Sequence, residues 1–92
     1  LQFFEPDYKK FKCLQLCLDA IRKGGNMSCI VNAANEIVNA GFRRGECGFL
    51  QMADIIEEVM EKATFDSQPD LDVYLQTDAE ARRIATELMH HI

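Results

Sequence analysis

Apolar and polar residues alternate along this chain with the period of an α-helix. In four stretches the apolar residues recur at spacings of three and four, which places them on one face of a helix. These stretches lie at about residues 11–23, 27–44, 50–63 and 77–91. Because the connections are short to moderate, we expect an all-α fold, a small domain resembling a four-helix bundle, with one longer loop before the last helix. The whole chain, 1–92, would form a single domain that begins with an extended linker, residues 1–10.

The first predicted helix carries a narrow apolar stripe. Phe11, Leu14, Leu18 and Ile21 stand at i, i+3, i+7 and i+10, with Cys17 beside them. This stripe is the face on which such a helix would pack.

The second predicted helix is apolar around most of its circumference. Asn32, Glu36, Asn39 and Arg43 fall on one narrow polar stripe, and apolar residues fill the remaining arc of about 200° at about 100° per residue. An arc that wide predicts contact with more than one neighbour. We take Asn32, Asn35, Glu36 and Asn39 as candidates for polar contacts, either within the bundle or to another domain. The alternative is that these side chains simply face solvent or join two helices.

Several residues mark predicted helix ends, and one indicates close packing. Asn26 or Ser28 can cap the second helix, and Gly45 would stop it. Gly41 lies inside that helix, where glycine costs ~0.5–1 kcal/mol relative to alanine, so we expect a neighbour to pack closely on it. The last helix would open with a capping box, Thr77–Glu80.

The segment before the last predicted helix is harder to assign. Residues 66–70 are typical of a loop. Leu71, Val73 and Leu75 then alternate with polar residues. We expect an extended loop pinned by these three apolar side chains, with a short strand as the alternative.

The charge and composition of the chain argue against some kinds of binding partner. The chain has 92 residues, a net charge of −5, 48% apolar and 27% charged residues, which is typical of a globular domain. An acidic chain with no basic face is unsuited to nucleic acid or to an anionic membrane surface. No apolar run approaches the ~20 residues that span a bilayer. Leu1 is not an initiator methionine, so we expect the chain to start within a longer sequence or to have been processed.

The four cysteines have no spacing that predicts a site. They are Cys13, Cys17, Cys29 and Cys47. We interpret them as small buried hydrophobes in a reducing cytosol. A zinc site with His90 and His91, a disulfide or a redox role are the alternatives, although the spacings match no usual zinc pattern.

The chain also lacks a catalytic motif. Gly24-Gly25 follows a predicted helix, whereas a phosphate-binding turn follows a strand. The two histidines lie at the C-terminus, where a general base would have no pocket around it. We therefore expect no catalytic, cofactor-binding or metal-binding residue in this chain.

A set of short motifs carries a family resemblance. Leu1–Asp7 looks like the pattern L-x-F-x-x-P-D, and Phe11–Leu16 looks like F-P-C-L-x-L, with lysine in place of proline at position 12. Asn32–Glu36 matches N-A-A-N-E, and Ala40–Phe42 and Gly48-Phe49 are similar to the landmarks that follow it. In order and spacing these motifs resemble the C-terminal domain of the 1-deoxy-D-xylulose 5-phosphate reductoisomerase family, over essentially all 92 residues.

The resemblance implies a larger enzyme. Members of that family convert 1-deoxy-D-xylulose 5-phosphate to 2-C-methyl-D-erythritol 4-phosphate in non-mevalonate isoprenoid biosynthesis, with NADPH and a divalent metal, Mg or Mn. The implied partners of this chain are the NADPH-binding and catalytic domains of the same polypeptide, and the implied full-length protein is a homodimer in the bacterial cytoplasm or in a plastid. The implied role of this part is non-catalytic support.

Two other classes of protein remain as alternatives. The chain could be a free-standing helical protein–protein interaction module, since it is complete as a bundle. It could also be a small metal-binding protein that uses its cysteines and histidines.

Overall fold

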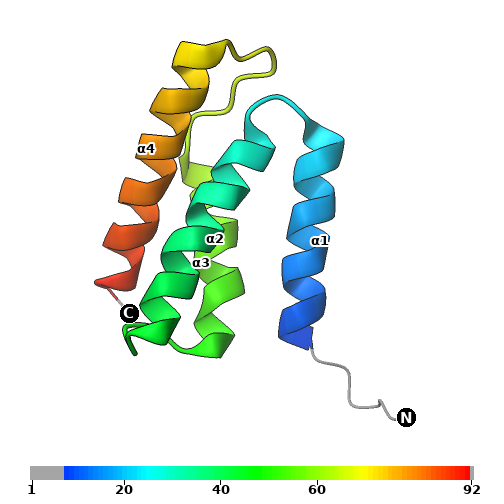
Figure 1. Ribbon diagram of the computed structural model, residues 1–92. Helices are drawn as coiled ribbons and strands as arrows, with labels where there is room; N and C mark the ends of the chain where they lie inside the picture. Colours follow the sequence, from blue (N-terminus) through cyan, green and yellow to red (C-terminus); the bar gives the residue numbers. More distant parts are fainter. Residues whose placement is uncertain (1–7, 92) are drawn as a thin grey trace.

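A computed structural model describes the backbone of residues 8–91 and the side chains of residues 12–91. The described part is all-helical, with four helices and no strand. The helices are α1 (Tyr8–Lys23), α2 (Met27–Arg43), α3 (Phe49–Lys62) and α4 (Leu71–Met89). Consecutive helices run in opposite directions, and α2 lies between α1 and α4 (Figure 1). The expected all-α fold is confirmed. Of the predicted linker, residues 8–10 belong instead to α1, and residues 1–7 lie outside the described part.

The central helix, α2, contacts all three other helices. Its buried side chains include Ile30, Ala33, Ala34 and Val38, each fully shielded from solvent. They pack with buried residues of α3 and α4, such as Val59 of α3, in one apolar core. The wide apolar arc of this helix therefore has the effect predicted from sequence, contact with more than one neighbour.

The apolar stripe predicted on the first helix is wrong as a packing face. The side chains that α1 buries are Leu16 and Ala20. The stripe points away from the bundle, with exposed fractions of 55% for Leu14, 38% for Leu18 and 69% for Ile21. The side chain of Phe11 lies outside the described part. Because α1 is apolar on two sides, periodicity alone could not decide which side meets α2 and α3.

An ion pair holds the N-terminal half of α1 to α3. Lys12 Nζ lies 2.5 Å from Asp54 Oδ1 and 3.0 Å from Glu57 Oε1. Hydrogen bonds to these two carboxylates raise the pKa of Lys12. Lysine at this position therefore forms a contact between helices that the proline of the family pattern cannot make.

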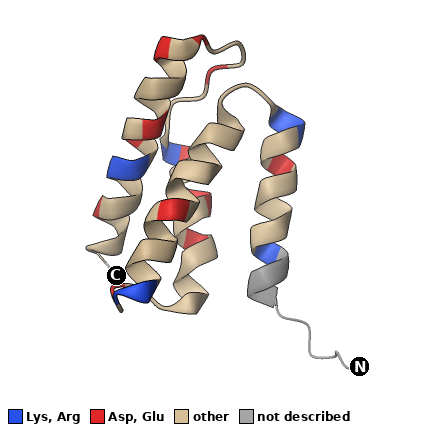
Figure 2. Cartoon of the chain, viewed as in Figure 1, with Lys and Arg blue, Asp and Glu red and all other residues tan. Residues whose placement is uncertain are grey.

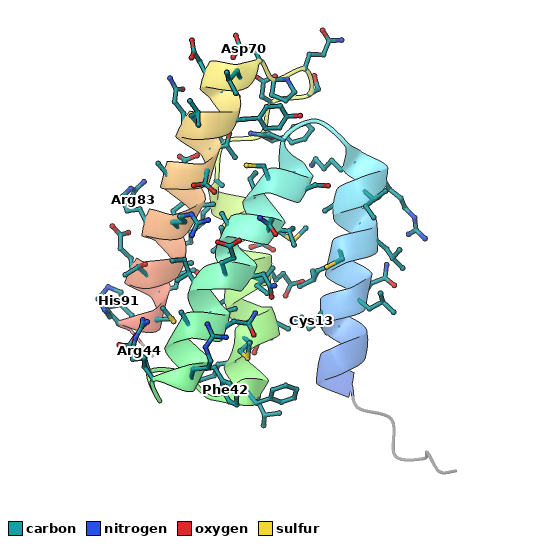
Figure 3. The ribbon with its side chains drawn as sticks, viewed as in Figure 1. Cys13, Phe42, Arg44, Asp70, Arg83 and His91 are labelled. Atoms are coloured by element: carbon teal, nitrogen blue, oxygen red, sulfur yellow. The ribbon has the colours of Figure 1, made fainter. Side chains whose placement is uncertain are left out.

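The last helix begins six residues earlier than predicted. Asp70 is its N-cap, and Asp70 Oδ1 accepts a hydrogen bond from the backbone N–H of Val73 at 2.9 Å (Figure 3). Leu71, Val73 and Leu75 are therefore helical, and the expected extended loop or strand is wrong. Thr77–Glu80 lies inside α4 and does not cap it. The helix ends at Met89.

Two glycines allow backbones and side chains to approach closely. A Cβ on Gly41 would collide with the thioether of Met89, which confirms the predicted close packing on α2. Gly25 has a φ of +56°, and a Cβ there would collide with the backbone of Asp66 in the α3–α4 loop. The start of α2 is therefore pressed against that loop, and glycine suits Gly25 for both its space and its φ.

Candidate functional site

The four candidate residues on the second helix lie on the solvent side of α2, and we call them the amide stripe: Asn32, Asn35, Glu36 and Asn39. Asn32, Asn35 and Glu36 are exposed, and Asn39 is half-buried. Asn39 Nδ2 donates to Asn35 O at 2.8 Å and to Asn35 Oδ1 at 3.0 Å, a contact within one helical turn. Asn32 makes no side-chain hydrogen bond to another residue among those described. The stripe therefore offers amide groups with unused hydrogen-bonding capacity.

Glu36 differs from the three asparagines because it has a partner on another helix. Arg82 of α4 donates from Nη2 to Glu36 Oε1 at 2.6 Å and from Nε to Asp78 Oδ2 at 2.9 Å. These hydrogen bonds, that to Asp78 first, raise the pKa of Arg82 further above its usual range. All three groups are partly exposed, so we assign the pair no more than ~1 kcal/mol. The Glu36–Arg82 contact links α2 to α4.

Asn26, which the sequence suggested as a cap of the second helix, instead uses its side-chain amide in hydrogen bonds to other parts of the fold. Asn26 is fully buried, and its side chain does not cap α2. Its Nδ2 donates to Thr64 O at 2.9 Å and to the hydroxyl Oγ1 of Thr77 at 2.8 Å. Its Oδ1 accepts from the backbone N–H of Asp66 at 2.8 Å, and its own N–H donates to Asp66 O at 3.0 Å. We call these four residues the Asn26 junction; it joins α2, the α3–α4 loop and α4.

Glu80 of α4 makes a further hydrogen bond to the α3–α4 loop, close to the Asn26 junction. Its Oε1 accepts from the backbone N–H of Thr64 at 2.9 Å, just beyond the end of α3. Together with the Asn26 junction this contact gives hydrogen-bond partners to backbone groups of the α3–α4 loop. The predicted capping role of Glu80 at the start of α4 is thus replaced by a contact across the loop. These groups hold structure together, and none is arranged as an acid, base or nucleophile.

The cysteines differ from one another in environment. Cys47 is buried, Cys13 and Cys29 are half-buried, and Cys17 is exposed, so the expectation of burial is wrong for Cys17. Burial raises the pKa of the Cys47 and Cys29 thiols. Cys13 lies on the side of α1 that faces α2 and α3 (Figure 3). Within residues 12–91 no disulfide forms, and no three His, Cys, Asp or Glu side chains come together as a metal site.

Charged residues are spread over the helices rather than gathered. Along α4 three acidic residues are followed by two arginines and then by Glu87. Figure 2 shows the charged residues distributed over the helices, with most of the described part of α1 uncharged. None of the described helices is both long and apolar enough to cross a membrane.

The described residues thus define a class, a small helical bundle domain that carries structural polar contacts and no constellation of catalytic groups. The family model for the DXP reductoisomerase C-terminal domain matches residues 1–84, and the chain belongs to this family. The resemblance inferred from the motifs is therefore confirmed.

Full-length relatives and a solved structure agree with this assignment. The chain is 55% identical over 89 residues to the 1-deoxy-D-xylulose 5-phosphate reductoisomerase of Bacteroides thetaiotaomicron, covering 97% of the chain and 23% of the relative. It is 40% identical over 92 residues to the enzyme of Shewanella amazonensis, covering all of the chain and 23% of that relative. The reductoisomerase of Zymomonas mobilis in complex with NADPH superimposes with a TM-score of 0.83 at 37% identity, covering 99% of this chain and 24% of that one. The chain therefore spans about a quarter of the length of its relatives.

Proposed function

We propose that this chain is the non-catalytic C-terminal domain of a 1-deoxy-D-xylulose 5-phosphate reductoisomerase. The observation that carries the proposal is its membership of the C-terminal domain family over residues 1–84, together with its coverage of only 23% of a 55% identical relative. The full-length protein would isomerise 1-deoxy-D-xylulose 5-phosphate and reduce the product to 2-C-methyl-D-erythritol 4-phosphate. This reaction belongs to non-mevalonate isoprenoid biosynthesis.

The cofactors of that reaction belong to the rest of the polypeptide. NADPH is present in the Zymomonas mobilis structure, and a divalent metal, Mg or Mn, is the second expected cofactor. Such metals are bound by several clustered oxygen ligands. No three carboxylates of residues 12–91 come together as such a site, and several of them pair with lysines or arginines, as Asp54 and Glu57 do with Lys12. We therefore assign no catalytic, cofactor-binding or metal-binding residue to this domain.

The role that we assign to the domain is mechanical support of the catalytic part. Residues 1–92 would act as one domain. Within it, the Asn26 junction and the Glu36–Arg82 pair fix how the helices sit against one another. Asn32, Asn35 and Asn39 would contact the rest of the enzyme. The full-length protein would be a homodimer in a bacterial cytoplasm or a plastid.

The activity is tested by expressing the full-length gene that contains this chain. We expect the purified protein to oxidise NADPH only when 1-deoxy-D-xylulose 5-phosphate and Mg or Mn are both present. The 92-residue chain alone, assayed in parallel, should show no turnover. A folded full-length protein that binds NADPH and yet fails to oxidise it with this substrate would contradict the proposal.

The second candidate function is a free-standing protein–protein interaction module, and the apolar surface of α1 favours it. An antibody raised to the chain, used on an extract of the source cells, separates the two. A band several times larger than the 10.5 kDa of the chain agrees with a domain of an enzyme. A band at the size of the chain itself would favour the interaction module.

A further inference from the structure

The outward face of α1 carries an exposed apolar stripe. Leu14, Leu18 and Ile21 stand at spacings of four and three, with Cys17 beside them, so they lie on one side of the helix. Ile21 is 69% exposed and Leu14 is 55% exposed. The stripe extends over eight residues, about 10 Å along the helix axis.

The stripe continues into a shallow groove between α1 and α2. The groove has a volume of about 280 Å³. Its α1 wall is apolar and is formed by Cys17, Ala20 and Ile21. Its α2 wall includes Asn32 and Asn35, the exposed amides of the stripe described above. One wall can therefore bury apolar side chains while the other offers donors and acceptors to a peptide backbone.

This combination matches a polypeptide better than a small molecule. The groove is shallow and lacks a charged group on either wall, so nothing in it would select a charged metabolite. An apolar side with adjacent amides is the arrangement that receives a loop or strand, whose side chains and backbone groups both need partners. Exposed apolar stripes of this kind normally mark such contacts.

The part of the relatives that this chain does not cover is the polypeptide that we expect on this surface. The matched family is that of a C-terminal domain, so most of the remaining length of the relatives precedes the matched part and joins this domain through α1. The part of the enzyme that enters through α1 is held beside this face at high effective concentration. Other exposed apolar side chains include those of Leu71, Tyr74 and Leu75, which span five residues of α4 and which we call the α4 patch, and those of Phe42, Phe49 and Leu50, where α2 ends and α3 begins. None of them lines the groove.

We propose that the outward stripe of α1 and the α1–α2 groove form the surface on which the preceding part of the same polypeptide packs. The occupant is an apolar surface of that part, with backbone groups that hydrogen-bond to Asn32 and Asn35. This inference rests on the proposed function, because it requires the chain to belong to a larger enzyme. It assigns the contact to one face of the domain and leaves the α4 patch in solvent.

Thiol accessibility in the full-length protein tests which face is covered. Ile21→Cys and Leu75→Cys are prepared separately; the native side chains are 69% and 63% exposed in the isolated fold, so they are a matched pair. Each protein is treated with iodoacetamide under native conditions, and alkylation at the new thiol and at Cys17 is followed by peptide mass spectrometry. Because a covered thiol reacts only when the contact opens, we expect the thiol at position 21 to react at least about tenfold more slowly than that at position 75.

Three results would overturn the proposal. Equal rates at positions 21 and 75 would show that α1 is not covered, and slower labelling at position 75 would assign the contact to α4. Protection at position 21 that disappears on dilution would mean that a second copy covers the stripe. Failure of the proposed function is distinguishable, because it appears as absent NADPH oxidation by the unmodified full-length protein whatever the labelling pattern.

A charge-insertion pair provides an independent test in the same full-length protein. Leu14→Asp with Ile21→Asp places two charges on the stripe, and Leu71→Asp with Leu75→Asp places two on the α4 patch. Because burying an unpaired carboxylate is costly, only the first pair should expose the domain junction to limited proteolysis, by about tenfold in rate. Equal proteolysis of the two variants would contradict the assignment to α1.

Discussion

Replacing Asn26 with alanine would remove the polar junction that joins α2, the α3–α4 loop and α4. The substitution deletes three side-chain hydrogen bonds, those to Thr64 O, to Thr77 Oγ1 and from the N–H of Asp66. Asn26 is fully buried and Thr77 is 4% exposed, so water cannot easily replace the lost partners. The perturbation therefore acts through unsatisfied groups as well as through lost contacts.

The expected magnitude follows from these contacts. Each net hydrogen bond contributes about 0.5–1.5 kcal/mol, and a buried group left without a partner costs about 1–3 kcal/mol. Allowing for partial relaxation of the loop, we expect Asn26→Ala to lower the free energy of unfolding by about 3–5 kcal/mol. A chain of this size has only about 5–14 kcal/mol of stability, at roughly 0.05–0.15 kcal/mol per residue. The loss would therefore be a large fraction of the total.

The assay is equilibrium unfolding of the 92-residue chain in urea, followed by far-ultraviolet circular dichroism. Asn32→Ala is the control, since Asn32 has the same side chain on the same helix but faces solvent, and it should change stability by no more than about 0.5 kcal/mol. Thr77→Val removes a single hydroxyl from the junction and should fall between the two. An unchanged slope against urea would show that stability, rather than the unfolded state, has changed. The reasoning is refuted if Asn26→Ala costs less than about 1 kcal/mol or no more than Asn32→Ala.

Three further predictions concern other features of the fold. Gly25→Ala should destabilise the chain by about 1–3 kcal/mol more than Gly24→Ala, because both have positive φ but only a Cβ at Gly25 meets the backbone of Asp66; equal losses in urea unfolding would count against the close approach. In the 92-residue chain Cys47 should be alkylated at least about tenfold more slowly than the exposed Cys17 at neutral pH, because burial raises the pKa of its thiol and blocks access. The raised pKa of Cys47 also makes stability depend on pH: its contribution is present below the pKa of the thiol in the unfolded chain and is lost as the pH rises through the pKa in the folded chain. Unfolding should therefore become easier above about pH 9. Equal alkylation rates of Cys47 and Cys17, or a stability that increases above that pH, would contradict these two predictions.

The helical fold could be predicted because local signals agree with the period of the apolar residues. The predicted α2 (27–44) and α3 (50–63) differ from the observed bounds by one residue at one or both ends. Gly45, with a φ of +78°, stops α2 where the sequence predicted. The family could also be recognised, because several motifs occur in a fixed order along one chain.

The start of α4 could not be predicted from alternation. Leu71, Val73 and Leu75 span only five residues, and a pattern that short fits a strand or the first turns of a helix equally well. Asp70, which follows a proline, was the usable signal, since aspartate is a strong N-cap and its side chain fills that role here. In the structure Leu71 and Leu75 are exposed, so the first turns of α4 do not bury these two leucines in the core.

The face of α1 and the role of Asn26 depend on tertiary contacts that local patterns do not contain. Leu16 and Ala20 form a smaller apolar side than the stripe opposite, yet they are the residues that meet the core. Asn26 finds its partners 38 to 51 residues away in sequence, so its position at a helix start suggested a cap. The candidate amides on α2 could be placed on a polar stripe from sequence, but the Arg82 partner of Glu36 could not.

The measurement that most directly tests the account is the turnover of the full-length protein with and without this domain. Two proteins are compared, the complete gene product and the same product ending immediately before Leu1 of this chain. We predict that the truncated protein still binds NADPH, measured by the fluorescence of the cofactor, but loses most of its oxidation of NADPH with 1-deoxy-D-xylulose 5-phosphate. A truncated protein that retains full turnover would contradict the conclusion that this domain supports the enzyme.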